Sequence, residues 1–509
     1  MQNLHQKPAP RTTVPRTEAA ESKMMKTRSL LTVFAFASIL AVSPAPAGQA
    51  PFGLLAPDIP VSSRDRVYTA DQFSNTVSVI NPSSNSLVGV IRLGELQPQN
   101  FSPLYRGQVL VHGMGFSPDR RTLAVVSIGS NSVTFIDTAT NAIKHITYVG
   151  RAPHEAFFTP DGKEVWVSVR GQDYIAVLDA QTYAEKLQIK LPPGPGMTIF
   201  SPDGRYGYVC SSFTPEMTVI SVADHAIVAT IKQQSPFCPD IAATPDGRQV
   251  WFTQKDLGKT VVFDARPPFT VLKVLDTGPL TNHVNFAFNK KGKFAYVTQG
   301  GDNHVAVFNI EDFTEVARIA VGDLPHGIWP SGDGTRVYVG LENDNAVTAI
   351  DALTQKVMAT IPVGQAPQAL IYVPGAVPDG DGTSNLVPLG KLGEAASLKL
   401  SPPSASNTIA HSTNVAIFEQ GLAQILQASV AGLEPRQPYV IALAARRDGT
   451  GTLEPLAEFV TNQAGAAVVQ AVGQIRTLVL TDKPGEQRYL VIVPRTSNGL
   501  GAPAQIQSN

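Results

Sequence analysis

Cysteine is scarce in this sequence, since Cys210 and Cys238 are the only two among 509 residues. No Cys-x-x-Cys-His occurs, which excludes covalently attached c-type haem. Cys210 ends one apolar run and Cys238 precedes another, so both are expected near one rim of the fold. The residues alone leave two alternatives open, a Cys210–Cys238 disulfide or two free buried thiols.

An excess of charge of one sign is also missing. The 40 Lys and Arg residues balance 41 Asp and Glu residues, which leaves a formal net charge of −1. Binding to nucleic acid or to an anionic membrane would need a basic excess or patch. We therefore expect no nucleic-acid partner.

Long hydrophobic runs are absent as well. The longest, Leu30–Val42, is too short to span a bilayer as a helix. It follows Lys26 and Arg28 and precedes Ala45-Pro46-Ala47, the arrangement of a secretory signal peptide. We expect a leader over 1–47 with the signal peptide at 24–47, cleavage after Ala47, and a periplasmic or secreted mature chain without a transmembrane segment.

A repeat fills most of the chain. Turns of the Pro-Asp-Gly type recur, and the last residues of these turns are Arg120, Gly162, Gly204, Gly247, Gly292 and Gly334, spaced by 42, 42, 43, 45 and 42 residues. Each repeat holds four short apolar runs rich in Val, Ile, Phe and Trp, separated by turn residues. A period in the forties with four strands per repeat predicts an all-β fold, a β-propeller whose blades are four-stranded.

The number of strands predicts how the ring closes. Naming the strands of a repeat A to D, each type occurs seven times, but the first repeat lacks its A strand. We expect a seven-bladed propeller over 65–373, preceded by a lead-in over 48–64. An A strand at 369–373 is expected to close it by pairing with the B, C and D strands at the N-terminal end.

The residues that follow the propeller predict a second, smaller domain. Residues 374–394 are rich in Gly, Pro and Asp and predict a linker. Alternating runs over 395–493 predict a small β-sandwich-like domain, with a helix as an alternative near Gln420–Gln427. The polar residues 494–509 predict a flexible tail.

The motifs of the repeat resemble those of the YVTN-repeat family of β-propellers. The matching residues are Leu324-Pro325-His326-Gly327, Val337-Tyr338-Val339, Asn345–Asp351 and Tyr296-Val297-Thr298-Gln299. The resemblance implies the fold, whereas propellers host many functions. Families of similar sequence include surface-layer proteins, exported binding proteins, propeller lactonases and the copper-bearing propeller of nitrous oxide reductase.

Histidines recur where the innermost strand of a blade begins. Eight residues before the bottom turn stand His112, His154 and His326, and the Ala366-Pro367 motif adds Gln368. We expect these four side chains to meet at the top mouth of the channel and bind a ligand. The three imidazoles could hold a single zinc or copper ion with Gln368 or water; alternatively, each histidine only bonds nearby backbone. His283 is out of register and is expected to point elsewhere.

Loops of the top face add further candidates. A long crossing over 96–110 contains Tyr105 and Arg106, and the loop beside His154 contains Arg170 and Asp173. Our first hypothesis is an exported, non-catalytic propeller that binds a small molecule or a protein partner through this face. The alternative is a lactonase-type hydrolase or a metal-dependent enzyme, for which His154 with Glu155 or Arg170 would supply a base and a cation. Whether the protein is an enzyme stays open, with binding preferred.

Overall fold

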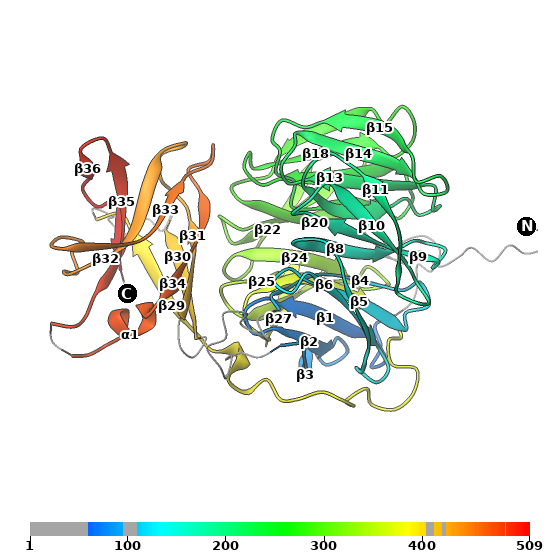
Figure 1. Cartoon of the computed structure of the whole chain (residues 1–509), viewed down its shortest axis with the longest axis horizontal. Coiled ribbons are helices and arrows are strands. Elements are labelled where there is room, and N and C mark those ends of the chain that lie inside the picture. The colour runs from blue at the N-terminus through cyan, green and yellow to red at the C-terminus, as the bar shows by residue number, and fades with distance from the viewer. Residues whose placement is uncertain (1–59, 95–108, 404–411, 420–423, 484, 509) are drawn as a thin grey trace, which may run out of the picture. The chain divides into compact units, whose positions relative to one another are not determined.

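The repeats form a ring of seven antiparallel four-stranded sheets in the computed structural model, which describes residues 60–94, 109–403, 412–419, 424–483 and 485–508. The blades follow one another along the chain, from β1 through β27 (Figure 1). The leader over 1–47 and the long crossing with Tyr105 and Arg106 lie outside the described residues.

The strand bounds follow the predicted period. Blade 1 comprises β28 (Pro367–Val373), β1 (Arg66–Asp71), β2 (Thr76–Asn81) and β3 (Ser86–Arg92). Blade 2 comprises β4 (Val111–Phe116), β5 (Thr122–Ser127), β6 (Ser132–Asp137) and β7 (Ile143–Tyr148). Blade 3 comprises β8 (Pro153–Phe158), β9 (Glu164–Val169), β10 (Tyr174–Asp179) and β11 (Glu185–Lys190). Blade 4 comprises β12 (Pro195–Phe200), β13 (Tyr206–Ser211), β14 (Glu216–Ser221) and β15 (Ile227–Lys232).

The last three blades have the same order. Blade 5 comprises β16 (Ile241–Ala243), β17 (Gln249–Gln254), β18 (Lys259–Asp264) and β19 (Val271–Asp276). Blade 6 comprises β20 (Thr281–Asn289), β21 (Gly292–Gln299), β22 (His304–Asn309) and β23 (Glu315–Ala320). Blade 7 comprises β24 (Pro325–Pro330), β25 (Arg336–Leu341), β26 (Ala346–Asp351) and β27 (Lys356–Pro362). The all-β, seven-bladed prediction is therefore confirmed.

The ring closes in blade 1, as predicted. Strand β28 pairs antiparallel with β1, so the two ends of the propeller share one sheet. At the end of β1 the Asp71 carboxylate is fully buried and accepts hydrogen bonds from the hydroxyls of Thr69, Thr76 and Ser78. Burial nevertheless raises the pKa of Asp71 to about 7.

The recurrent bottom turns are structural. In the Thr159 and Ser201 turns the hydroxyl donates to the aspartate two residues later, and Gly162 and Gly204 have φ of 71° and 72°. Such a φ strains any residue with a β-carbon, which explains glycine there. These Ser/Thr-Pro-Asp-Gly segments are turns and carry no catalytic arrangement.

The C-terminal residues form one nine-stranded sheet rather than the two sheets of a sandwich. Its strands are β29 (Ala395–Ser401), β30 (Thr413–Glu419), β31 (Gln424–Val430), β32 (Pro438–Ala444), β33 (Leu453–Val460), β34 (Ala467–Gly473), β35 (Tyr489–Thr496), β36 (Gly499–Leu500) and β37 (Gln505–Gln507). We call this sheet, with the short helix α1 (Ile475–Val479), the C-terminal module.

Two expectations for this region need correction. Residues 424–427 are strand, because β31 pairs with β30 and β34 on either side. The expected flexible tail contains β37, which pairs with β29 and β35 inside the sheet. The expected linker is anchored to the propeller: Arg66 donates to the carbonyl of Asp381, and Val387 bridges Val90; it ends in the 3-10 turn η1 (Gly390–Gly393).

One face of the C-terminal module packs on the propeller. Because side chains alternate along a strand, Leu426 and Ala428 of β31 enter the module's own core while Gln427 points the other way. Gln427 Nε2 donates to Glu342 Oε2 at 2.8 Å. Phe418 packs against Phe73 of blade 1 with the rings tilted by 57° and their centroids 5.0 Å apart. The propeller and the C-terminal module belong to one compact unit, Pro44–Asn509.

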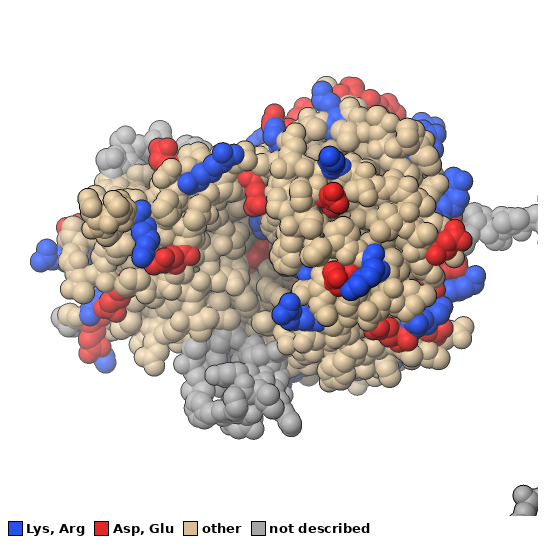
Figure 2. Space-filling model, turned by 45° about the horizontal axis from the view of Figure 1, so that its top comes forward, with Lys and Arg blue, Asp and Glu red and all other residues tan. Residues whose placement is uncertain are grey.

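In the described part of the chain, no helix is long and apolar enough to cross a membrane. Basic and acidic side chains are interspersed on the face shown in Figure 2, which agrees with the balanced composition.

Candidate functional site

A β-bulge at the start of the innermost strands sets the geometry of the channel mouth. In blade 2, Val111 pairs with Ser127 and Met114 with Val125, so two residues of β4 oppose one residue of β5. The same shift occurs in β24, between Pro325 and Ile328. Bulges re-aim side chains and are frequent beside functional sites. In both blades the bulged residues are a histidine followed by a glycine, His112-Gly113 and His326-Gly327, so each bulge presents one histidine side chain.

Eight side chains from six blades make up what we call the mouth cluster. They are His112, His154, Glu155, Asp240, His283, His326, Glu342 and Gln368. After burial, the pKa of His112 in blade 2 responds to the charges of His326 in blade 7 and Arg170 of blade 3, which agrees with convergence on one opening. The predicted residues His112, His154, His326 and Gln368 all lie in this cluster.

His112 and His154 form a close pair. Their Nε2 atoms are 3.1 Å apart, and their rings meet edge to face with centroids separated by 4.6 Å. Both Nδ1 atoms are buried without a hydrogen-bond partner among the described residues. Burial, the largest cause, lowers the pKa of His112 to about 3 and that of His154 well below its usual value. Both rings are therefore neutral at physiological pH.

His326 is held differently, by a carboxylate. Its Nδ1–H donates to Glu342, whose other oxygen accepts from Gln368 Nε2 at 2.6 Å and from Gln427 of the C-terminal module. Burial, the largest single cause, raises the pKa of Glu342, but the charge and hydrogen bond of His326, the charge of Lys255 and the hydrogen bond of Gln368 together lower it. The hydrogen bond from Nδ1–H to the carboxylate fixes the orientation of the His326 ring.

His283 also belongs to the cluster, so the expectation that it points elsewhere is wrong. Its ring meets that of His326 edge to face at a centroid distance of 4.6 Å, and it lines the channel. The cause is a longer hairpin, since Asn289 pairs with Gly292 and adds two residues between the bulge and the turn. Counting eight residues back from Gly292 therefore selects Val284. By strand pairing, the residue equivalent to His112 is Asn282.

Two acids of the mouth cluster are protonated more readily than usual. Glu155 accepts one hydrogen bond from the Met114 amide, and Asp240 accepts one from the Val284 amide at 2.7 Å. Burial dominates in both, raising the pKa of Glu155 well above its usual value and that of Asp240 to about 7. Sequence patterns missed Asp240 and Glu342, because their roles depend on the bulge and on contacts between blades.

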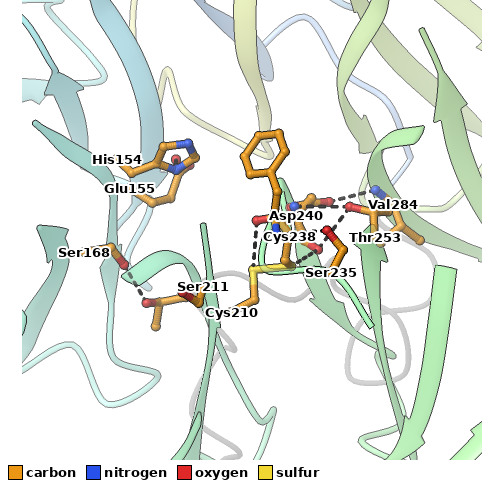
Figure 3. The surroundings of a disulfide bond; sticks show 12 residues. His154, Glu155, Ser168, Cys210, Ser211, Ser235, Cys238, Asp240, Thr253 and Val284 are labelled. Atoms are coloured by element: carbon orange, nitrogen blue, oxygen red, sulfur yellow. Dashed lines mark hydrogen bonds and ion pairs between the residues drawn. A yellow bond between two sulfur atoms is a disulfide. The ribbon is translucent and has the colours of Figure 1, made fainter. Parts of the chain in front are cut away.

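A disulfide joins blades 4 and 5 beside the mouth. Cys210 and Cys238 are bonded, with Cα atoms 5.9 Å apart, and Figure 3 shows them in the same surroundings as His154, Glu155 and Asp240. Arg170 lies nearby: its guanidinium is 5.5 Å from the Phe213 ring centroid and 5.7 Å from that of Phe237. Asp173 is not part of the cluster, because it pairs with exposed Lys190 at 2.7 Å.

The expected three-histidine metal site does not form in this arrangement. No group of three His, Cys, Asp or Glu side chains has metal-binding spacing within the described ranges. The Nε2 atoms of His112 and His154 are 3.1 Å apart, close to the separation of about 3.4 Å that two nitrogens on tetrahedral zinc would have.

The channel and the bottom face of the ring are weaker candidates for a binding site than the mouth. The channel below the cluster contains a cavity of about 30 Å³, room for a water molecule. A larger hollow of about 870 Å³ lies among the bottom turns of blades 3 to 5, but its charges neutralise one another, as in Lys186–Glu164 and Arg205–Asp203. The mouth is therefore the better candidate site.

A family model and the Desulfotomaculum acetoxidans structure support the fold. A family model described as a lactonase, seven-bladed β-propeller, matches residues 147–360. The chain is similar to a solved structure of Kuenenia stuttgartiensis hydrazine synthase (19% identity, TM-score 0.49, covering 63% of this chain and 99% of that one). It is also similar to a functionally unknown protein from Desulfotomaculum acetoxidans DSM 771 (14% identity, TM-score 0.51, covering 60% and 98%). No curated protein matches the chain.

Proposed function

We propose that this protein is a binding propeller whose channel mouth takes a small molecule. One observation carries the proposal: within the described ranges, several buried polar atoms without a hydrogen-bond partner belong to residues at or just after the top ends of blade strands. They include His112 Nδ1, His154 Nδ1, Arg170 Nε, Ser212 Oγ and both side-chain polar atoms of Gln254. Burying an unpaired polar group costs about 1–3 kcal/mol, so such a concentration favours a ligand that pairs them.

The test is a ligand-observed NMR screen of a defined small-molecule library. Hits should bind the wild-type protein and lose at least tenfold in affinity in the His112→Ala/His154→Ala variant. His145→Ala, which removes an exposed histidine of β7, is the matched control and should keep the affinity. Hits whose affinity is the same in all three proteins would contradict the proposal.

Lactone hydrolysis is the second candidate, favoured by the family match over blades 3 to 7. A neutral His154 could accept a proton from water as the water adds to the lactone carbonyl carbon. Arg170 could stabilise the resulting oxyanion. Protonated Glu155 could then deliver a proton to the ring oxygen as the ester C–O bond breaks, giving a hydroxy acid. A pH-stat assay of a lactone panel tests this, and turnover that survives His154→Ala would reject the assignment.

Two further proposals concern the metal and the compartment. A zinc or copper ion on His112 and His154 would appear in metal analysis of the purified protein and disappear in the double variant. Export is supported by the signal-like segment 24–47 and by the disulfide, which needs an oxidising compartment. N-terminal sequencing of the mature protein should begin after Ala47.

A further inference from the structure

Two cations near the mouth cluster lack the partners that buried cations normally have. Arg170 follows β9 and Lys255 follows β17, and both are half-buried. Arg170 Nε has no hydrogen-bond partner, and Lys255 has no ion pair within 4 Å, among the residues that the structure describes. In contrast, Lys186 and Lys259 each contact a carboxylate at 2.9 and 2.6 Å. Buried cations are almost always paired.

Both cations lie close enough to the imidazoles for their charges to act on the histidine pKa values. The charge of Arg170 contributes to the lowered pKa of His112 and of His154, after burial, and the charge of Lys255 contributes to that of His283. These rings are uncharged and cannot repel an anion, but they cannot neutralise the cations either.

Glu342 and Asp256, the carboxylates that act on Lys255, form no ion pair with it. Glu342 already accepts hydrogen bonds from His326, Gln368 and Gln427. Burial raises the pKa of Asp256, and it accepts from Ser235. Among the residues that the structure describes, Arg170 and Lys255 therefore have no carboxylate within ion-pair distance.

The disulfide positions the donors of Arg170. Phe213 comes three residues after Cys210, and Phe237 directly precedes Cys238, so the bond ties together the two loops whose rings contact the guanidinium. Gly194 leaves room for one of these rings, since a β-carbon there would lie 2.6 Å from Phe213. A guanidinium in contact with aromatic rings keeps its edge N–H groups available, and that planar fork matches oxyanions.

We propose that the molecule bound at the mouth is an oxyanion, held by Arg170 and Lys255, with Phe213, Phe237 and the Cys210–Cys238 disulfide as positioning elements. This inference rests on the proposed small-molecule function and adds its chemical class. A carboxylate or a phosphate provides the required chemistry, and the test separates them.

The experiment measures dissociation constants by NMR titration with acetate, inorganic phosphate and acetamide, the neutral isostere of acetate. Wild-type protein should bind one of the two anions at least tenfold more tightly than acetamide, and the tighter anion identifies the source. Arg170→Gln and Lys255→Gln should each lose at least tenfold in that anion's affinity. Lys259→Gln, which removes an ion-paired lysine of the same blade as Lys255, should keep it. The anion affinity of Arg170→Lys should lie between those of the wild type and Arg170→Gln.

The outcomes distinguish the two proposals. Equal binding of acetate and acetamide, with sensitivity to His154→Ala, would overturn the oxyanion inference and leave the binding function standing. Anion affinity unchanged in Arg170→Gln would overturn the inference and indicate an adventitious surface site. Absence of any probe binding, together with no hits in the library screen, would overturn both. Unfolding midpoints of each variant verify folding, and reduction of the wild-type disulfide should weaken anion binding in a protein without substitutions.

Discussion

Replacing Asp71 by Asn should stabilise the ring closure at alkaline pH. The folded protein holds the Asp71 proton up to a pKa of about 7, whereas the unfolded chain releases it near 3.8. Between these values the unfolded state binds fewer protons, so stability falls as pH rises. A pKa difference of this size corresponds to a loss of about 4 kcal/mol in the unfolding free energy of the wild type. Asparagine does not titrate, and it can accept from two of the three hydroxyls and donate to the third.

The assay is urea unfolding of wild type and Asp71→Asn at pH 4, 6 and 8. After subtracting about 1 kcal/mol for a weakened hydrogen bond, we expect the variant to be more stable by about 3 kcal/mol at pH 8 and no more stable at pH 4. Asp173→Asn is the control, because its exposed ion pair with Lys190 should contribute at most about 1 kcal/mol. If Asp71→Asn is destabilised equally at all three pH values, the carboxylate is ionised in the fold and our reasoning fails.

Three further perturbations probe the mouth. Cys210→Ala/Cys238→Ala opens a loop with a separation of 28 residues, which should cost about 3.6 kcal/mol; a reductant should move the wild-type urea midpoint, but not that of the variant. Glu342→Gln should cost roughly 3–5 kcal/mol at pH 7. Because the folded pKa of Glu342 is lowered, this difference should shrink as pH falls below 4.5, and a pH-independent loss would contradict the assignment. Gly113→Ala would place a β-carbon 1.9 Å from a Glu155 carboxylate oxygen, so it should destabilise by about 1–3 kcal/mol and weaken ligand binding; an unchanged Tm would exclude this packing.

The repeat period and the closure could be predicted because both depend on local signals. Turn residues at 42 to 45 residue intervals and the strand count fixed the blade boundaries within a few residues. The histidines at the mouth followed from that period, since equivalent positions of successive blades face one channel.

The rest of the site depends on contacts that no local pattern contains. Two additional residues in the β20–β21 hairpin moved His283 into the mouth, although the spacing of the turns alone suggested the opposite. Glu342 follows the end of β25 in a loop, where a solvated carboxylate is the ordinary expectation, and it becomes buried through His326, Gln368 and a residue of the C-terminal module. The pairing of β37 was similarly hidden, because a three-residue strand has no periodicity.

The most direct test of the central account is a pH titration of ¹⁵N-labelled histidine side chains by NMR, assigned with single His→Ala variants. If His112, His154 and His283 are buried together at the channel mouth, their rings should stay neutral throughout pH 5–8 while folding is retained, since burial lowers their pKa values, that of His112 to about 3. Titration of these three rings near pH 6.5, as for exposed imidazoles, would contradict the mouth cluster and the binding function derived from it.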